Sequence, residues 1–282
     1  MLTEPIASSG DDPDFAELLA LDEREQGRFR GACHDGAPMR AFGGQLAAQA
    51  FVAAAKTVPA QQAPASMHAY FAKNALANEP VEYIVSTIRD GNSFSSKSVA
   101  AVQHGQTVLV LLASFYRPED GPDRQQLPAE FAPPLADASE REHSAHQSIA
   151  DRFVDQQELT APVPTAGRPG VGQFRRWMRA RLATGAEPTL RAGAIIYMAD
   201  MVLARAALQP HVESAQDRPR ATSLDYAVWF HGETQPSAWL LFDASSPVLK
   251  GTRALAFAHV YDESGTLVAS SAQDVLARQL PG

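Results

Sequence analysis

Cysteine is nearly absent from this chain of 282 residues, which contains only Cys33. One thiol cannot form an intrachain disulfide, and a lone cysteine is more often a small buried apolar residue than a nucleophile. The eight histidines of the sequence do not form a cluster with the spacing of metal ligands. We therefore expect no disulfide, no metal site and no cofactor.

Runs of basic residues and long apolar runs are also missing. The formal net charge is -8, and no stretch of Lys and Arg is dense enough to follow a nucleic-acid backbone. Apolar stretches such as 46–55 and 108–113 are much shorter than the roughly 18 residues that cross a bilayer. The sequence therefore predicts neither a nucleic-acid partner nor a membrane span.

Targeting signals are not evident in the sequence. Residues 1–12 lack the basic start and apolar core of a secretory signal, and the last four residues, 279–282, are not a peroxisomal address. Hydrophobic residues make up 45% and charged residues 20%, which is ordinary for a folded globular protein. We expect a cytoplasmic enzyme or binding protein.

Proline and polar residues concentrate in the middle of the chain. Residues 117–172 hold eight of the twenty prolines and show little sustained apolar periodicity, which is typical of a linker. We expect one short helix at most within it, at 143–153. The predicted organisation is an N-terminal domain at 1–116, a Pro-rich linker at 117–172 and a C-terminal domain at 173–282.

The two segments that flank this linker have similar patterns. Phe71 and Phe230 end comparable strands, and Gly105 and Gly265 mark comparable turns at almost the same separation along the chain. The pattern predicts an α+β fold made by duplication, with a long central helix wrapped by an antiparallel sheet in each half. The expected helices are 42–57 and 189–208, and the expected strands are 66–73, 81–89, 94–104 and 107–115 in the first half and 222–231, 238–242, 253–261 and 267–276 in the second.

Asp200 is the only charged residue between Ala192 and Ala204, in a run that is apolar on every side of the expected helix. Burying an ionised carboxylate without partners costs several kcal/mol or more. Such a group is therefore paired, hydrogen-bonded or used in chemistry. The residues alone leave both a catalytic role and a structural one open, the second by pairing with Arg205 or another basic group.

Several short motifs occur in order over both halves: Phe42-Gly43-Gly44-Gln45, Met67-His68-Ala69-Tyr70-Phe71, Arg89-Asp90-Gly91-Asn92-Ser93-Phe94-Ser95, Ala113-Ser114-Phe115, Ser223-Leu224-Asp225, Trp229-Phe230-His231 and Val268-Ala269-Ser270-Ser271-Ala272-Gln273. As a set they resemble the acyl-CoA thioesterase II family. The resemblance implies a double hotdog fold, which is two tandem hotdog domains. It also implies an enzyme that hydrolyses fatty acyl-CoA to free fatty acid and CoA.

In that family an aspartate on the second helix, a threonine or serine on the next strand and a glutamine on the last strand hold the attacking water. The resemblance places these roles on Asp200, Ser223 and Gln273. The residue types suit the chemistry, because a carboxylate can accept a proton, a hydroxyl can donate and accept, and an amide can fix the water. At the separation that relates Gly105 to Gly265, the counterpart of Gln273 is Ala113, so the first half lacks this set and we expect one active site per chain.

Three further residues are candidates for substrate contact. The Gly43-Gly44 pair lets a ligand approach the start of the first helix, so we predict that the Gly44 N–H, with Gln45, stabilises the oxyanion of the thioester. His68 is a third candidate, although a histidine in a strand is more often structural. The sequence has no Gly-x-Ser-x-Gly elbow, which argues against a serine-nucleophile thioesterase.

Two other functions are compatible with the same fold. The main alternative is a non-catalytic acyl-CoA-binding double-hotdog protein, which would have no need of three polar groups around one water. A hotdog hydratase fits less well, because Asp200 has no histidine close to it in the sequence. Since a double hotdog resembles a dimer of single hotdogs that assembles further, we expect a homodimer or homotetramer.

The sequence departs from the family pattern at three places. Tyr226 stands where family members often carry His, Gly232-Glu233 where Arg-Pro is frequent, and Lys73-Asn74-Ala75 where Arg-Pro-Gly is common. These residues lie near expected strand ends and turns. We expect them to affect substrate preference, CoA contacts or oligomer surfaces more than the catalytic candidates.

Overall fold

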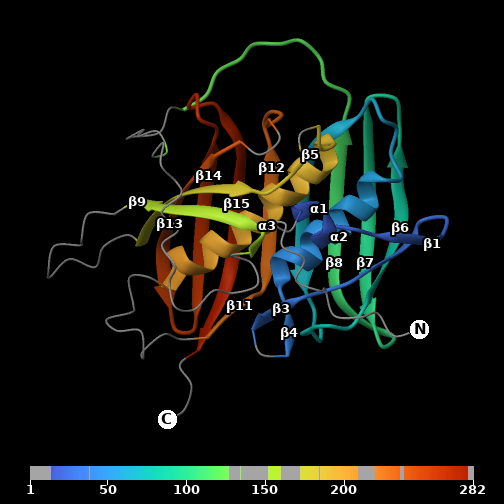
Figure 1. Ribbon diagram of the computed structural model, residues 1–282, viewed down its shortest axis with the longest axis horizontal. Helices are drawn as coiled ribbons and strands as arrows, with labels where there is room; N and C mark the ends of the chain where they lie inside the picture. Colours follow the sequence, from blue (N-terminus) through green and yellow to red (C-terminus); the bar gives the residue numbers. More distant parts are fainter. Residues whose placement is uncertain are drawn as a thin grey trace, which may run out of the picture.

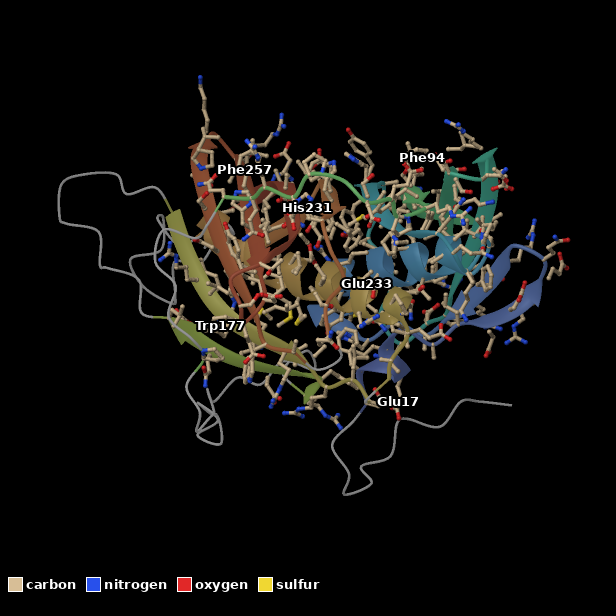
Figure 2. All side chains as sticks on the ribbon, turned by 90° about the horizontal axis from the view of Figure 1, so that it is seen from above. Glu17, Phe94, Trp177, His231, Glu233 and Phe257 are labelled. Atoms are coloured by element: carbon tan, nitrogen blue, oxygen red, sulfur yellow. The ribbon has the colours of Figure 1, made fainter. Side chains whose placement is uncertain are left out.

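The computed structural model describes residues 14–37, 39–126, 134, 152–159, 172–183, 185–208, 220–235 and 238–278. Within this part of the chain, two long helices lie against one face of a continuous antiparallel sheet (Figure 1). Figure 2 shows from above that the sheet curves around these helices. The hydrophobic core therefore lies between the helices and the concave face of the sheet.

The N-terminal half contains a long helix and the strands that surround it. Its elements are α1 (Phe15–Leu18), β1 (Asp22–Glu25), β2 (Arg28–Gly31), β3 (Asp35–Ala37), β4 (Arg40–Ala41), α2 (Gly43–Ala55), β5 (Ala63–Phe71), β6 (Val81–Asp90), β7 (Phe94–Gln103) and β8 (Gln106–Tyr116).

The C-terminal half repeats most of this arrangement. Its elements are β9 (Val154–Leu159), β10 (Gly172–Ala180), α3 (Pro188–Leu208), β11 (Arg220–Ser223), β12 (Asp225–Phe230), β13 (Leu240–Lys250), β14 (Arg253–Tyr261) and β15 (Leu267–Arg278).

The order of strands in the sheet shows the duplication. From the middle outward, one half runs β5-β8-β7-β6-β2-β1 and the other runs β12-β15-β14-β13-β10-β9. The halves meet where β5 pairs antiparallel with β12, with Ala227 opposite His68. The strand order of one half therefore mirrors that of the other, which confirms the predicted α+β architecture of two tandem hotdog units.

The two long helices run antiparallel and touch through glycines. Gly44 of α2 lies beside Asp200 of α3, and Gly193 of α3 lies beside Val52 of α2. A Cβ atom added to Gly44 would lie 3.0 Å from the Asp200 Cβ, and one added to Gly193 would lie 3.3 Å from the Val52 Cγ2. Glycine therefore permits the close packing of α2 on α3. No helix among the described residues is both long and apolar enough to cross a membrane.

Two strands at the C-terminal edge of the sheet were not predicted from the sequence. β9 lies inside the segment predicted as a linker, and it reads Val-Asp-Gln-Gln-Glu-Leu, which has no apolar alternation. Charged pairs hold it to β10, including Arg179 Nη2 to Asp155 Oδ2 at 2.8 Å. The short helix expected at 143–153 lies almost entirely outside the described residues, and the domain bounds 1–116, 117–172 and 173–282 stay a prediction.

Candidate active site

Three polar side chains meet beside the middle of α3. The Ser223 hydroxyl donates to Asp200 Oδ1 at 3.2 Å, and the Gln273 Nε2 donates to the Ser223 Oγ at 3.0 Å. Gln273 Nε2 also donates to Asp200 Oδ1. A helix and two strands thus bring together the three residues that the sequence had placed in one site.

A break between β11 and β12 directs Ser223 toward the helix. Leu224 interrupts the strand, its N–H donating to the Asp274 carbonyl and its carbonyl accepting from the Phe71 N–H. Ser223 pairs with Val275 of β15, and Gln273 lies two residues before Val275. Residues that pair directly across two strands share a face of the sheet, and so do side chains two residues apart on one strand. Ser223, Val275 and Gln273 therefore point to the same side of the sheet.

Burial controls the electrostatics of Asp200, which is only 5% exposed. Loss of water raises the pKa of the carboxyl above its ordinary value, while hydrogen bonds from Gln273, Ser223 and the Gly44 backbone N–H lower it in part. A carboxylate with a raised pKa accepts a proton more readily than an exposed one. The arrangement therefore suits a general base.

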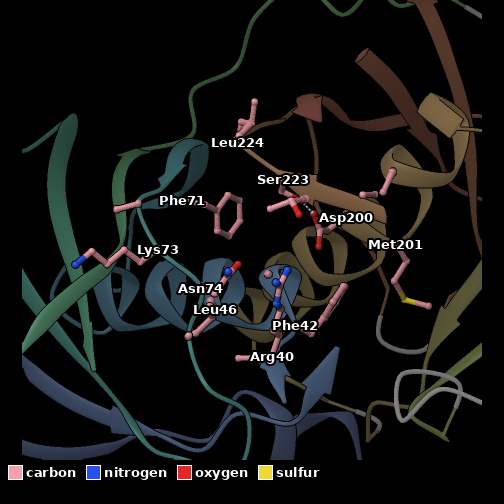
Figure 3. Close-up of a pocket in the computed structure, with 17 residues that line it drawn as sticks. Arg40, Phe42, Leu46, Phe71, Lys73, Asn74, Asp200, Met201, Ser223 and Leu224 are labelled. Atoms are coloured by element: carbon pink, nitrogen blue, oxygen red, sulfur yellow. Dashed lines mark hydrogen bonds between the residues drawn. The ribbon is translucent and has the colours of Figure 1, made fainter. Parts of the chain in front are cut away.

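The carboxylate opens on a pocket of about 480 Å³ at the N-terminal end of α2 (Figure 3). Asp200 and Ser223 line this pocket, whereas Gln273 is completely buried behind them. The remaining lining is mixed, with apolar and basic side chains, and comprises Arg40, Ala41, Phe42, Gly43, Leu46, Phe71, Ala72, Lys73, Asn74, Ala75, Met201, Ala204, Ala221, Thr222 and Leu224.

Two family models match nearly the whole chain. Residues 33–116 match the acyl-CoA thioesterase N-terminal domain, and residues 118–277 match the acyl-CoA thioesterase C-terminal domain. The chain belongs to the acyl-CoA thioesterase family. Its class is therefore that of a thioester hydrolase.

Individual relatives agree with this assignment of the thioesterase. It is 30% identical to mouse acyl-coenzyme A thioesterase 8, over 94% of this chain and 88% of the mouse protein. It is 27% identical to acyl-CoA thioesterase 2 of Haemophilus influenzae, over 94% and 97% of the two chains. A crystal structure of acyl-CoA thioesterase II TesB2 from Mycobacterium marinum matches with a TM-score of 0.79 and 31% identity, covering 95% of this chain and 98% of the other.

Gly44 of the thioesterase contacts the Asp200 carboxylate directly. Its backbone N–H forms a hydrogen bond with Asp200, and a Cβ atom at this position would lie 2.6 Å from the Phe42 ring. The oxyanion contact predicted for the Gly44 N–H would therefore require this hydrogen bond to be exchanged for one to the substrate. Gly43 also lines the pocket, at the same end of α2.

The structure does not bring Gln45 or His68 into the pocket. The Gln45 Nε2 donates to the carbonyls of Leu18 and Ala32, at 2.9 and 3.1 Å, so its amide fastens α2 to the N-terminal segment. His68 is exposed on the opposite face of β5 and packs edge-on against Trp229 with ring centroids 5.1 Å apart. The alternation of β5 explains this, because Met67 and Ala69 face the core.

The sequence pattern identified part of the pocket wall and missed the rest, including Arg40, Leu46 and Met201. Arg40 and Lys73 are exposed cations in the lining, and Phe42 and Met201 are apolar residues next to Asp200. Arg40 and Met201 belong to no motif of the sequence, and their positions depend on packing between distant segments. Cys33 is buried, and burial raises the pKa of its thiol to about 12, so it is held in the protonated form. Within the described part of the chain, no group of His, Cys, Asp or Glu side chains is placed to hold a metal ion.

Proposed function

We propose that this thioesterase hydrolyses fatty acyl-CoA to a free fatty acid and CoA, with Asp200 as the base that activates water. The observation that carries the proposal is the buried carboxylate, which is hydrogen-bonded to Ser223 and Gln273 and opens on the pocket. These partners occupy Asp200 Oδ1. The Oδ2 atom lies near Gly43, 3.5 Å from the place of a Cβ there, on the side where a water and a thioester would approach.

The reaction needs no covalent intermediate with the protein. The water oxygen attacks the carbonyl carbon while Asp200 takes a proton from that water. The tetrahedral intermediate then breaks its C–S bond, and the departing sulfur of CoA takes the proton back from Asp200. Backbone N–H groups at the start of α2 are suited to the developing oxyanion, because the first turn of a helix has unpaired donors.

The pocket also suits the anionic head of CoA. Arg40 and Lys73 are exposed in its lining, and the Lys73 Nζ donates to a neutral group, the Gln106 Oε1, at 2.6 Å. In a chain of net charge -8, two such cations give the mouth a local positive charge. We expect them to contact the phosphates of CoA.

Replacing Arg40 and Lys73 with neutral residues distinguishes binding of the CoA head group from the chemical step. In Arg40→Gln and Lys73→Gln, KM for acyl-CoA should rise several-fold, while KM for the corresponding acyl-pantetheine, which lacks the nucleotide, should stay unchanged. Steady-state kinetics with both substrates measures this. Arg24→Gln, which removes an exposed cation outside the pocket lining, is the control. An equal effect on both substrates would exclude a phosphate contact.

The decisive test of hydrolysis is CoA release by the wild type and by Asp200→Asn. We expect turnover of acyl-CoA by the wild type and a fall of about 10² or more in the variant, because the amide cannot accept the proton. Asp243→Asn is a matched control, since that carboxylate pairs with Arg175 at 2.9 Å in the same half. Tight acyl-CoA binding without turnover in the wild type would establish the non-catalytic binder instead.

The outer face of the sheet supports a homodimer or homotetramer. Tyr70, Leu112, Trp229 and Phe257 are exposed there, at 67%, 50%, 39% and 42%. Exposed apolar side chains gathered on one sheet face are typical of a protein contact. Light scattering that gives the mass of a single chain would exclude this assembly. A cytoplasmic location stays a prediction.

A further inference from the structure

Tyr226 lies directly behind Asp200 and forms an unusual contact with the helix that carries it. The residue is on β12, is 1% exposed and faces α3. Its hydroxyl donates to the Ile196 carbonyl at 2.6 Å. The Asp200 backbone N–H forms a hydrogen bond with the same hydroxyl.

These two backbone groups are partners in an ordinary α-helix. The N–H of residue 200 and the carbonyl of residue 196 are four residues apart, the spacing at which a helix closes its own hydrogen bond. The Tyr226 hydroxyl therefore joins the ladder of α3 at the turn that carries the carboxylate. A buried hydroxyl that is hydrogen-bonded to both groups of one helix turn restrains the backbone of that turn.

The same tyrosine fixes the other side of the site. Ser223 precedes Tyr226 by three residues, across the break at Leu224. Asp200 and Ser223 come from different elements, and their 3.2 Å hydrogen bond depends on the distance between α3 and this break. The contact of Tyr226 with Ile196 joins the same two elements from the buried side, away from the pocket.

We propose that Tyr226 is a positioning residue for Asp200, tying the turn of α3 that bears the carboxylate to the strand segment that bears Ser223. Its hydroxyl does not line the pocket and has no part in proton transfer. The polar groups that do face the carboxylate are Ser223, Gln273 and the Gly44 N–H, with Arg40 and Lys73 in the pocket lining. This inference rests on the proposed function for its kinetic consequences only.

Tyr226→Phe removes the tie and keeps the ring. We expect kcat to fall about 10-fold with KM within about twofold, since small displacements of a catalytic group are costly while the pocket is unchanged. The acid limb of the pH profile of kcat/KM should move to higher pH. Misaligned Ser223 and Gln273 would no longer lower the pKa of Asp200 against the effect of burial.

Tyr83→Phe is the matched control. Tyr83 is also buried, and its hydroxyl also donates at 2.6 Å, but to the Gln49 Oε1 of α2. A loss of general packing or stability should appear in both variants. If both lower kcat equally, or if Tyr226→Phe keeps the wild-type kcat and acid limb, the proposal is wrong. Tyr226→Met, which fills much of the same space without a hydroxyl, replaces the phenylalanine variant if that one does not fold.

The Asp200 pKa can also be measured without turnover, which separates this inference from the proposed function. Burial raises the pKa of Asp200 in the folded protein above its unfolded value, so the folded state holds the proton more tightly. The protonated Asp200 carboxyl therefore stabilises the folded state at low pH, and this stabilisation is lost as pH rises through the pKa of Asp200 in the folded protein.

The difference in unfolding free energy between each protein and its Asp200→Asn counterpart, followed against pH, reports that titration. In the Tyr226→Phe background, the stabilisation contributed by the Asp200 carboxyl should be lost at higher pH than in the wild type. An unchanged midpoint would overturn the positioning role, even if the protein proved not to hydrolyse acyl-CoA. If the wild type shows no turnover but the midpoint still shifts in the Tyr226→Phe background, the positioning role of Tyr226 stands and only the proposed reaction is wrong.

Discussion

Gln273 influences the reaction from outside the pocket. It is completely buried and outside the pocket lining, and its Nε2 donates to both Asp200 and Ser223. Its Oε1 has no hydrogen-bond partner among the described residues. Because a buried amide that is only half satisfied costs stability, we infer that its orientation is retained for the carboxylate and not for the fold.

Gln273→Met should therefore change the pH dependence of the enzyme. The amide lowers the pKa of Asp200 against the effect of burial, so its loss should raise that pKa and move the acid limb of kcat/KM to higher pH. We also expect kcat to fall about 10-fold. The pH profile of acyl-CoA hydrolysis tests this, with Gln103→Met as the control, since Gln103 binds the Leu76 backbone outside the pocket. An acid limb at the wild-type pH would contradict it.

At the scale of single residues, the sequence identified Asp200 for a physical reason. It is a lone charge in a helix segment that is otherwise apolar all round, and the structure buries it. The candidates His68 and Gln45 depended instead on their membership of a motif. Strand alternation would have placed His68 on the outer face, since its neighbours Met67 and Ala69 are apolar. No local signal showed that the Gln45 amide binds backbone carbonyls.

At the scale of elements, the start of α2 is adjusted to the site. A Cβ atom on Gly44 would lie 3.0 Å from the Asp200 Cβ and 2.6 Å from the Phe42 ring. Gly44→Ala should therefore displace α3 or Phe42, lowering kcat about 10-fold or more and the free energy of unfolding by about 1–3 kcal/mol. Turnover assays and chemical denaturation of the variant measure the two effects.

Gly121→Ala, outside the pocket lining, is the control for this change. A Cβ atom there would have no neighbour within 4 Å, so activity and stability should stay near the wild type. Wild-type turnover in Gly44→Ala would show that α2 and α3 can separate without moving the carboxylate. It would also argue against the prediction that the Gly44 N–H stabilises the oxyanion.

Elements with regular apolar patterns could be predicted from the sequence, and irregular ones could not. The expected helix at 189–208 matches α3 except at its first residue, and the expected strand at 253–261 is β14. The expected strand at 222–231 is divided at Leu224, because Leu224 and Asp225 bond to Asp274 and the chain bends there. That division directs Ser223 to Asp200, so the feature that builds the site is the one that periodicity did not show.

At the scale of the whole molecule, duplication gives the chain two related ends. The turn of α3 with Asp200 packs on Gly44 at one end, and Val52 of α2 packs on Gly193 at the other. A cavity of about 720 Å³ lies at this second end, and its lining includes Val52, Pro64 and Phe115. The second end thus has space, but apolar residues stand near the places of the carboxylate and its partners.

This asymmetry predicts one reactive site per chain. At the separations that relate the two halves, Ala113 is the counterpart of Gln273 and Pro64 that of Ser223, so neither counterpart position carries an amide or a hydroxyl. Val52, next to Gly193, cannot accept a proton from water. A non-hydrolysable acyl-CoA analogue should therefore bind the folded protein with a stoichiometry of one per chain by calorimetry, and Asp200→Asn should remove the turnover of the whole chain. Two equivalent sites, or about half of the turnover remaining in Asp200→Asn, would mean that the N-terminal half has a catalytic group of its own.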